Sequence, residues 1–379
     1  YLKYINFNNA GSSKPLNDVN KEINSFLEIE KNYGGYYAVL KYKKKLNCFY
    51  NNLSKLINCK PREISFLTST TLAWNLFFNS LEIDENQNTL IFENEYGSNL
   101  IYYKNKRHNI KIVNIKKNGR VCFEDLKKKI NKNTKVVSLC HVASQCGNRI
   151  EVEKICNFVK QLFPEVICVL DACQSIGQLE VDVKKINCDV LVGSGRKYLR
   201  GPRGTGFIYI NDKIREKINP MILDMKNAEI IGDKIKINKS NIFENFEFSP
   251  SLQLGFSKAI EKVNKYGINK IEQNIICKSK YFRKKLENFH QIIFFENIDT
   301  LTGINTLKIK GINSLQIYTY LLSKRILCSV TKSSSSLLYF KKLKVKDLLR
   351  ISFHQYNSYD DINYLVKCLI DLIKKKAII

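Results

Sequence analysis

The chain has 379 residues, of which 44% are hydrophobic and 26% charged, with only 6 prolines. This composition is typical of a folded globular protein and excludes a disordered or collagen-like chain. The net charge of +27, from 62 Lys and Arg against 35 Asp and Glu, raises the question of a nucleic-acid partner. The lysines are scattered along the whole chain, however, so we expect a solvated basic surface and no nucleic-acid or membrane partner.

Short β-rich runs alternate with amphipathic helical stretches from about residue 60 to residue 210. The predicted strands are 63–67, 89–93, 110–115, 135–140, 166–172, 188–194 and 204–210, and two of the predicted helices are 122–130 and 152–162. Strands that are apolar on both faces and alternate with helices indicate a mostly parallel sheet covered by helices. In such sheets, ligands bind at the carboxyl ends of the strands.

The pattern changes after residue 240, where helices dominate and the strands are fewer. The predicted elements are helices at 251–266, 271–289, 314–324 and 360–374, and strands at 304–310, 326–330 and 348–353. This order indicates a small α+β domain. We therefore expect a large domain at 18–243, with 1–17 and 244–379 forming a smaller domain packed tightly against it.

The 12 cysteines contain no CxxC pair, and several lie inside apolar runs. Free buried thiols in a reducing cytoplasm explain this pattern better than a disulfide framework does. Cys140, His141 and Cys146 lie near one another, but the rest of a tetrahedral metal set is missing, so we expect no metal site. No apolar run approaches the roughly 18 residues that cross a bilayer, and the first residues lack a signal-peptide pattern. These features predict a cytoplasmic protein.

Polar side chains gather where two predicted strands end. Asp171 ends one strand and is followed by Gln174, while the next strand ends in Ser194 and is followed by Arg196 and Lys197. An acid and a lysine at one sheet edge can be a structural ion pair, and such pairs outnumber catalytic ones.

A possible phosphate site shifts that balance towards a cofactor. Ser69, Thr70 and Thr71 lie between a predicted strand and a helix start, where hydroxyls and free backbone N–H groups can hold phosphate, although an ordinary helix cap is the commoner explanation. Pyridoxal phosphate needs a lysine for a Schiff base, a carboxylate for its ring nitrogen and an anion site. The sequence supplies all three at one sheet edge.

The segment "LDACQSIGQLEVDV" and the segment "CDVLVGSGRKYLRGPRGTGFIYI" resemble the class V aminotransferase and cysteine desulfurase superfamily of fold type I pyridoxal-phosphate enzymes. The resemblance extends over almost the whole chain, through "FNNAG", "GGYYA", "STTLAWN", "NEYGSN", "FENFEFSPSLQLG" and "LLRISFHQYNSYDDI" in the expected order. It implies a PLP-dependent fold type I enzyme, with a mostly parallel seven-stranded sheet in the large domain, a smaller α+β C-terminal domain, an amino-acid substrate and a homodimer.

The resemblance also implies roles for individual residues. Lys197 would bind the cofactor covalently and move protons, Asp171 would pair with the ring nitrogen and Gln174 would bind the phenolic oxygen. Tyr96 would stack on the ring where desulfurases have histidine. The phosphate would be held by Thr70, Thr71, Ser194 and Arg196, with Arg196 in the usual place of a histidine. Ser144 occupies the position of an asparagine near the phenolic oxygen.

The same resemblance implies which residues meet the substrate. Arg350 would bind the α-carboxylate through a bidentate contact. Asn9, Ala10 and Gly11 would line the substrate side. Tyr36 would reach the site, either within its own chain or from a neighbouring subunit; as plain sequence it would be a core aromatic.

The reaction is where this sequence departs from a standard desulfurase. Desulfurases carry a cysteine on a mobile loop, whereas here Cys328 falls in a predicted strand and four serines follow at 333–336. The chain resembles more closely the branch called isopenicillin N epimerase-like, which includes ergothioneine-pathway C–S lyases. We expect β-elimination with C–S cleavage of a cysteine-derived substrate. An aminotransferase or epimerase of the same superfamily is one alternative, and a catalytically silent binding or scaffold homologue is another.

Overall fold

A seven-stranded sheet forms the centre of the computed structural model, which describes residues 4–377. In spatial order the strands are β2 (Ile64–Leu67), β8 (Gly206–Ile210), β7 (Val190–Ser194), β6 (Ile167–Asp171), β5 (Thr134–Cys140), β3 (Asn88–Phe92) and β4 (Ile110–Val113). β8 runs antiparallel to both of its neighbours, and the other neighbouring strands pair in parallel. The predicted α/β fold with a mostly parallel sheet is confirmed.

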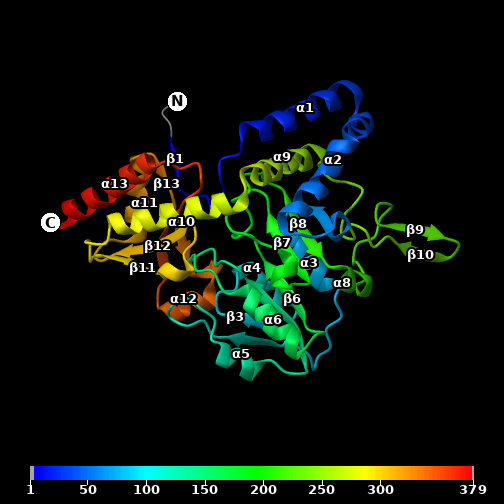
Figure 1. Ribbon diagram of the computed structural model, residues 1–379, viewed down its shortest axis with the longest axis horizontal. Helices are drawn as coiled ribbons and strands as arrows, with labels where there is room; N and C mark the ends of the chain where they lie inside the picture. The colour runs from blue at the N-terminus through cyan, green and yellow to red at the C-terminus, as the bar shows by residue number, and fades with distance from the viewer. Residues whose placement is uncertain (1–3, 378–379) are drawn as a thin grey trace.

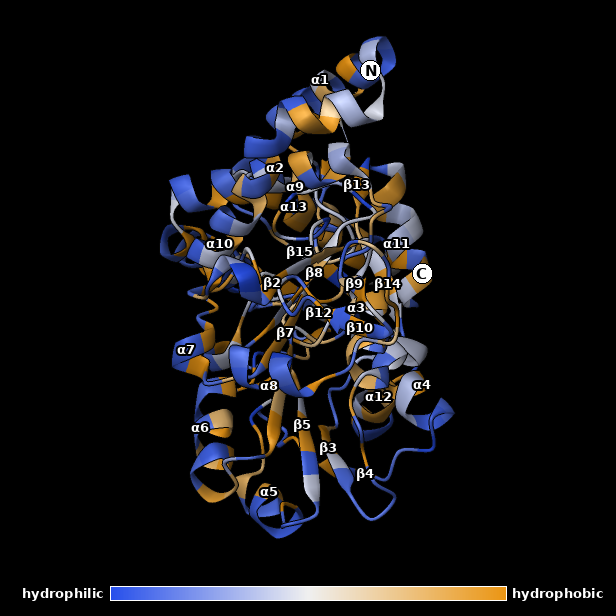
Figure 2. Ribbon diagram, turned by 90° about the vertical axis from the view of Figure 1, so that its right-hand side faces the viewer, coloured by the Kyte–Doolittle hydropathy of each residue, from blue (hydrophilic) through white to orange (hydrophobic). Residues whose placement is uncertain are grey.

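Helices cover both faces of this sheet because its strands are apolar on both faces. In β6, Cys168 and Leu170 join one buried cluster, while Ile167 and Val169 join another, since successive side chains of a strand point to opposite faces. In Figure 2 the apolar strands lie between α6 on one side and α4 on the other. The helices that follow the strands are α3 (Thr70–Asn79), α4 (Gly97–Asn105), α5 (Phe123–Lys129), α6 (Val152–Leu162), α7 (Val183–Ile186) and α8 (Asp212–Lys217).

Three long helices pack together beside the sheet. They are α1 (Asn17–Tyr33), α2 (Gly35–Ile57) and α9 (Pro250–Tyr266), and Figure 1 shows them side by side at the top. The close approach of α1 and α9 depends on Gly255, because a Cβ at this position would lie 2.6 Å from Cγ1 of Ile23. Helix α9, which falls in the predicted small domain, thus packs on α1 and α2. The division of the chain after residue 243 stays a prediction.

A second sheet is antiparallel and lies in the C-terminal part of the chain. Its strands, in spatial order, are β11 (Ile292–Phe294), β12 (Ile304–Ile309), β15 (Asp347–Ser352) and β14 (Ser329–Lys332). The helices α10 (Ile268–Lys285), α11 (Ser314–Ser323) and α13 (Tyr359–Ala377) share an apolar cluster with these strands. The N-terminal strand β1 (Ile5–Asn6) joins this region through parallel pairing with β13 (Ile326–Leu327). Within residues 4–377, no helix is both long and apolar enough to span a membrane.

The structure differs from the predicted elements at several places in this part of the chain. The predicted strand 326–330 divides at Cys328 into β13 and β14, which belong to different sheets. The predicted helix 271–289 is α10, which ends at Lys285. The hairpin of β9 (Ala228–Ile231) and β10 (Lys234–Ile237) was not predicted and projects to the right in Figure 1. The remaining short helix is α12 (Leu337–Leu343).

A buried carboxylate joins the two parts of the chain. Glu296 accepts hydrogen bonds from Gly147 N at 3.2 Å and Thr306 N at 2.8 Å, and it forms an ion pair with Arg283 at 2.5 Å. The loop of Gly147 follows β5 of the large sheet, whereas Arg283 lies on α10 and Thr306 on β12.

We predict that Glu296→Ala lowers the free energy of unfolding by about 3–5 kcal/mol, because the Arg283 guanidinium would stay buried without its partner. Chemical denaturation followed by circular dichroism measures this. The matched control is Glu261→Ala, which removes a carboxylate paired with Lys258 at the surface and should change stability by less than about 1 kcal/mol. Equal losses in the two variants would contradict the prediction.

Candidate active site

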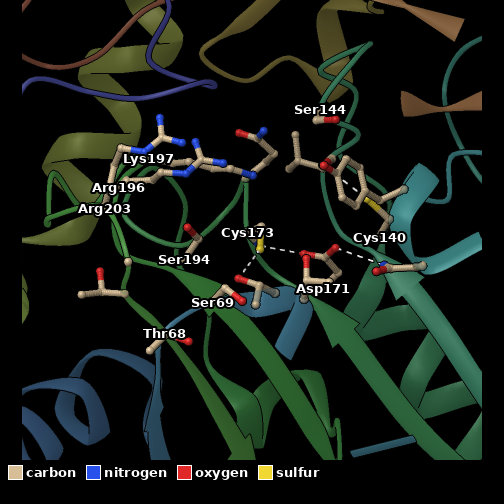
Figure 3. A pocket seen from close by; sticks show the side chains of 18 residues that line it. Thr68, Ser69, Cys140, Ser144, Asp171, Cys173, Ser194, Arg196, Lys197 and Arg203 are labelled. Atoms are coloured by element: carbon tan, nitrogen blue, oxygen red, sulfur yellow. Dashed lines mark hydrogen bonds between the residues drawn. The ribbon is translucent and has the colours of Figure 1, made fainter. Parts of the chain in front are cut away.

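A pocket opens at the carboxyl ends of β5, β6 and β7, where the sequence predicted a site (Figure 3). Its cavity volume is about 290 Å³. Of the predicted residues, the structure places these in its wall: Thr70, Thr71, Tyr96, Ser144, Asp171, Gln174, Ser194, Arg196 and Lys197. Residues from five different segments of the chain therefore meet in one cavity.

Lys197 lies on the turn that follows β7. Two backbone hydrogen bonds close this turn, from Arg200 N to Lys197 O at 3.0 Å and from Gly201 N to Gly195 O at 2.8 Å. The side chain points into the pocket (Figure 3) and is partly buried. Burial lowers the pKa of Lys197, although Cys173 and Asp171 offset part of this effect. A lysine with a lowered pKa can act as a nucleophile or a base.

Asp171 is buried at the end of β6 and is held by two donors. Its Oδ1 accepts from Cys173 N at 2.9 Å and its Oδ2 accepts from the Asn99 side chain at 3.3 Å. Gln174 donates from Nε2 to Ala10 O at 3.0 Å, while its buried Oε1 has no partner among the described residues. A buried acceptor without a donor is costly, so Gln174 is available to a ligand.

The opposite end of the pocket is suited to an anion. Ser69 caps α3 by accepting from Leu72 N at 3.1 Å, and Thr70 donates to Gly193 O at 3.0 Å. Arg196 donates to Gly11 O, and the guanidinium of Arg203 lies beside it (Figure 3). Burial lowers the pKa of Arg196, and the charge of Arg203 lowers it further. Two cations and a helix N-terminus favour a phosphate-like group here.

Arg350 extends from β15 of the second sheet and is buried. Its guanidinium donates to Ser329 Oγ at 3.1 Å, Ser144 O at 2.7 Å and Asn8 Oδ1 at 3.2 Å. All three acceptors are neutral, and burial lowers the pKa of Arg350 to about 10. The structure therefore holds a buried cation that lacks an anionic partner among these contacts.

The predicted substrate residues near the N-terminus have structural contacts. Asn9 donates to Ser352 O at 2.7 Å, and Ala10 N donates to Ser352 Oγ at 2.9 Å. The carbonyl groups of Ala10 and Gly11 accept from Gln174 and Arg196. This segment thus positions the pocket residues.

Tyr36 lies away from the pocket of its own chain, and its contact with a neighbouring subunit's site stays a prediction. It lies in the first turn of α2, outside the pocket, and is 84% exposed. The alternative reading of Tyr36 as a core aromatic is therefore wrong. Within one chain it does not reach the site, since α2 packs on α9 and not on the pocket.

Sequence reasoning missed several residues of the pocket, among them Asn99, Cys140 and Cys173. The Cys173 thiol donates to Thr70 Oγ1 at 3.2 Å, and burial raises its pKa to about 12. A signal was present, because Cys173 lies between Asp171 and Gln174 on the turn after a predicted strand. No comparable signal marked Asn99, which lies inside a helix. Among the described residues, no cluster of His, Cys, Asp and Glu could hold a metal ion.

The serine-rich segment forms a short turn packed against the start of α4. A Cβ at Gly97 would lie 2.3 Å from Ser334 O, so only glycine allows this approach. Ser336 Oγ also donates to Glu95 O at 3.5 Å. Cys328, which precedes this turn, is buried, and burial raises the pKa of its thiol to about 12. A thiol in this state is a poor nucleophile.

Comparisons with known proteins agree with this geometry. The aminotransferase class-V family model matches residues 5–365, and the chain belongs to this family. A probable cysteine desulfurase of Borreliella burgdorferi is 27% identical, over 99% of this chain and 92% of the relative. A putative cysteine desulfurase of Plasmodium berghei, PbSufS, is 30% identical over 69% of this chain and 53% of its own length.

Solved structures show the same fold. The apo structure of a cysteine desulfurase from Thermococcus onnurineus NA1 has a TM-score of 0.90 and 24% identity, covering 98% of this chain and 95% of the other. A mutant of C-DES with glycine covalently linked to its PLP cofactor has a TM-score of 0.88 and 17% identity, covering 98% and 97%. Enzymes of this family use pyridoxal phosphate.

The residues of the pocket fit that cofactor. The wall of the pocket holds the unpartnered Oε1 of Gln174, the amine of Lys197 and the two guanidinium groups of Arg196 and Arg203. An anionic phosphate ester with polar ring substituents would give these groups partners.

The burial of each thiol predicts how fast it reacts with a labelling reagent. Cys48 and Cys277 are exposed, whereas Cys140, Cys173 and Cys328 are buried. In a short pulse of N-ethylmaleimide, we expect the native protein to be modified at Cys48 and Cys277, with the three buried thiols protected until denaturant is added. Peptide mapping by mass spectrometry reads this out. Modification of native Cys328 at the rate of Cys48 would contradict the structure.

Proposed function

We propose that this chain is a PLP-dependent lyase that cleaves the C–S bond of a cysteine-derived amino acid by β-elimination. The observation that carries the proposal is the convergence of Lys197, Asp171 and the anion end of one pocket, with the buried Arg350 beside it. The cysteine desulfurases among its relatives support sulfur-containing substrates.

The pocket suggests how the cofactor would be held. Asp171 would face the ring nitrogen and Gln174 the phenolic oxygen, with Ser144 near the same oxygen. Tyr96 would cover one face of the ring, since an aromatic side chain stacks favourably on another ring. The phosphate would bind where Thr70, Thr71, Ser194 and Arg196 meet at the start of α3.

Once bound, pyridoxal phosphate supplies an electron sink for negative charge at the substrate α-carbon. Arg350 would bind the α-carboxylate of the amino acid and so orient the α-hydrogen. Lys197 Nζ would accept that hydrogen as a proton, because burial lowers the pKa of its amine. The C–S bond then breaks, and its electron pair leaves with the sulfur as a thiolate that takes up a proton. The carbon skeleton leaves as 2-aminoacrylate, which water converts to pyruvate and ammonia.

The serine turn supports elimination over sulfur transfer to the enzyme. The segment that would carry a thiol offers Ser333–Ser336 instead, and the nearby Cys328 is buried. This supports a place in the isopenicillin N epimerase-like and ergothioneine C–S lyase-like branch, where the sulfur fragment leaves as a free thiol. We also propose a homodimer, supported by the exposed aromatic side chains of Tyr33, Tyr36 and Tyr37 on α1 and α2.

Replacement of Lys197 tests the central claim. We expect Lys197→Ala to lose the visible absorbance of bound pyridoxal phosphate and to lower kcat for pyruvate release by at least about 10²-fold, since it removes the proton acceptor. Spectra and a coupled pyruvate assay measure both. If the wild-type protein shows no cofactor band after addition of pyridoxal phosphate, the enzyme proposal fails and a binding or scaffold role replaces it.

The products distinguish the possible reactions. The wild-type protein is mixed in turn with cysteine, a cysteine S-conjugate and L-alanine. Pyruvate from the S-conjugate supports the lyase. Alanine from cysteine would indicate desulfuration, D-alanine from L-alanine would indicate epimerisation, and pyruvate from alanine would indicate transamination.

Cys328 separates elimination from sulfur transfer to the enzyme. We expect Cys328→Ala to lower kcat/KM by less than about tenfold, because a buried thiol takes no part in elimination. A tenfold decrease corresponds to about 1.36 kcal/mol of transition-state stabilisation. The rate of sulfide or thiol release from the same substrates measures this. Complete loss of sulfur release, with the cofactor spectrum and the fold intact, would make Cys328 a sulfur acceptor.

A further inference from the structure

A second carboxylate lies behind Asp171 and has no role in the steps above. Glu95 is 1% exposed and lies two residues before the start of α4. Its Oε1 accepts from Tyr96 N at 2.8 Å and from Asn99 Nδ2 at 2.9 Å, and its Oε2 accepts from Ser138 Oγ at 2.9 Å. Three donors and a helix N-terminus surround this buried acid.

One amide group bridges the two acids. Asn99 Nδ2 donates to Glu95 Oε1 at 2.9 Å and also to Asp171 Oδ2 at 3.3 Å. Because an amide nitrogen has two hydrogens, it can serve both carboxylates at once. Asn99 itself lines the pocket. The orientation of Asp171 therefore depends on a side chain that Glu95 holds in place.

The charge of Glu95 also acts on Asp171. Burial raises the pKa of Glu95 to about 7, and its hydrogen bond from Asn99 opposes this rise, while the charge of Asp171 adds to it. The other titratable groups that face Glu95 are Tyr103 on α4 and Cys140 on β5. Burial raises the pKa of both well above its ordinary value, so both are uncharged. The electrostatic coupling is thus mainly between the two acids.

We propose that Glu95 is a positioning residue for Asp171: through the Asn99 amide it fixes the carboxylate that faces the cofactor's ring nitrogen, and its charge strengthens the hold of that carboxylate on the ring proton. This inference rests on the proposed role of Asp171. A cation at the ring nitrogen would favour the charged form of Glu95. Glu95 would then be the group that couples cofactor binding to pH near neutrality.

The test measures binding of pyridoxamine 5'-phosphate to cofactor-free protein by calorimetry. This probe keeps the ring nitrogen and the phosphate but cannot join to Lys197. We expect Glu95→Gln to weaken binding about tenfold at pH 8, equivalent to about 1.4 kcal/mol. In the wild-type protein, ionisation of Glu95 should raise the affinity between pH 6 and pH 8, and this rise should be smaller in the variant. The pH range follows from the value near 7 for Glu95.

A double-mutant cycle separates positioning from a merely structural effect. In the Asp171→Asn background, Glu95→Gln should cause no further loss of affinity. The matched control is Glu93→Gln, which alters a carboxylate on the same turn that binds Ile115 N at 2.6 Å and should leave affinity unchanged. If Glu95→Gln fails to fold, Asn99→Ala breaks the same bridge and should show the same cycle.

The outcomes distinguish the two proposals. Strong weakening by Asp171→Asn with no effect of Glu95→Gln, or equal effects of Glu95→Gln in both backgrounds, would overturn the role of Glu95 alone. No weakening by Asp171→Asn would overturn the role assigned to Asp171, and the proposed function with it.

Discussion

The desolvation of basic side chains that form no ion pair is the constraint on which this site depends. Arg196 and Arg350 donate to neutral oxygens, and Lys197 is desolvated in the same pocket. Such charges are costly in a low-dielectric interior unless an anion arrives. The free energy gained by burying the large apolar clusters around the sheet offsets that cost. The same arrangement favours anionic ligands, because a phosphate and a carboxylate would each give one cationic end a partner.

Much of the large domain could be predicted because its signals are local. Runs such as 166–172 and 188–194 are continuously apolar, as strands covered on both faces must be, and their polar last residues mark the edge of the sheet. Asp171, Ser194 and Lys197 followed directly from that rule. The resemblance to a known family added Tyr96, Ser144 and Arg350, whose separation along the chain hides their proximity.

Other features could not be predicted because they depend on contacts distant in sequence. The break at Cys328 exists since β13 pairs with β1, whereas β14 pairs with β15. Tyr36 is exposed because α2 packs on α9 through its other face. Neither Glu95 nor Asn99 carries a sequence signal of its own, and only the position of Asp171 beside them reveals a shared amide. Side-chain networks of this kind leave no regular pattern in the sequence from which they could be predicted.

The hydrogen bonds between residues 6–11 and the end of β15 have a consequence for biosynthesis. Asn9 and Ser352 are 343 residues apart in sequence, yet they form one hydrogen-bonded unit that carries Gln174 and Arg196. During translation the contacts of this early segment with β15 can therefore form only after β15 has left the ribosome. Contacts of such long range form late and slowly. The cofactor pocket would be the last region to become ordered, so a nascent chain could complete its central sheet well before it gained any capacity for chemistry.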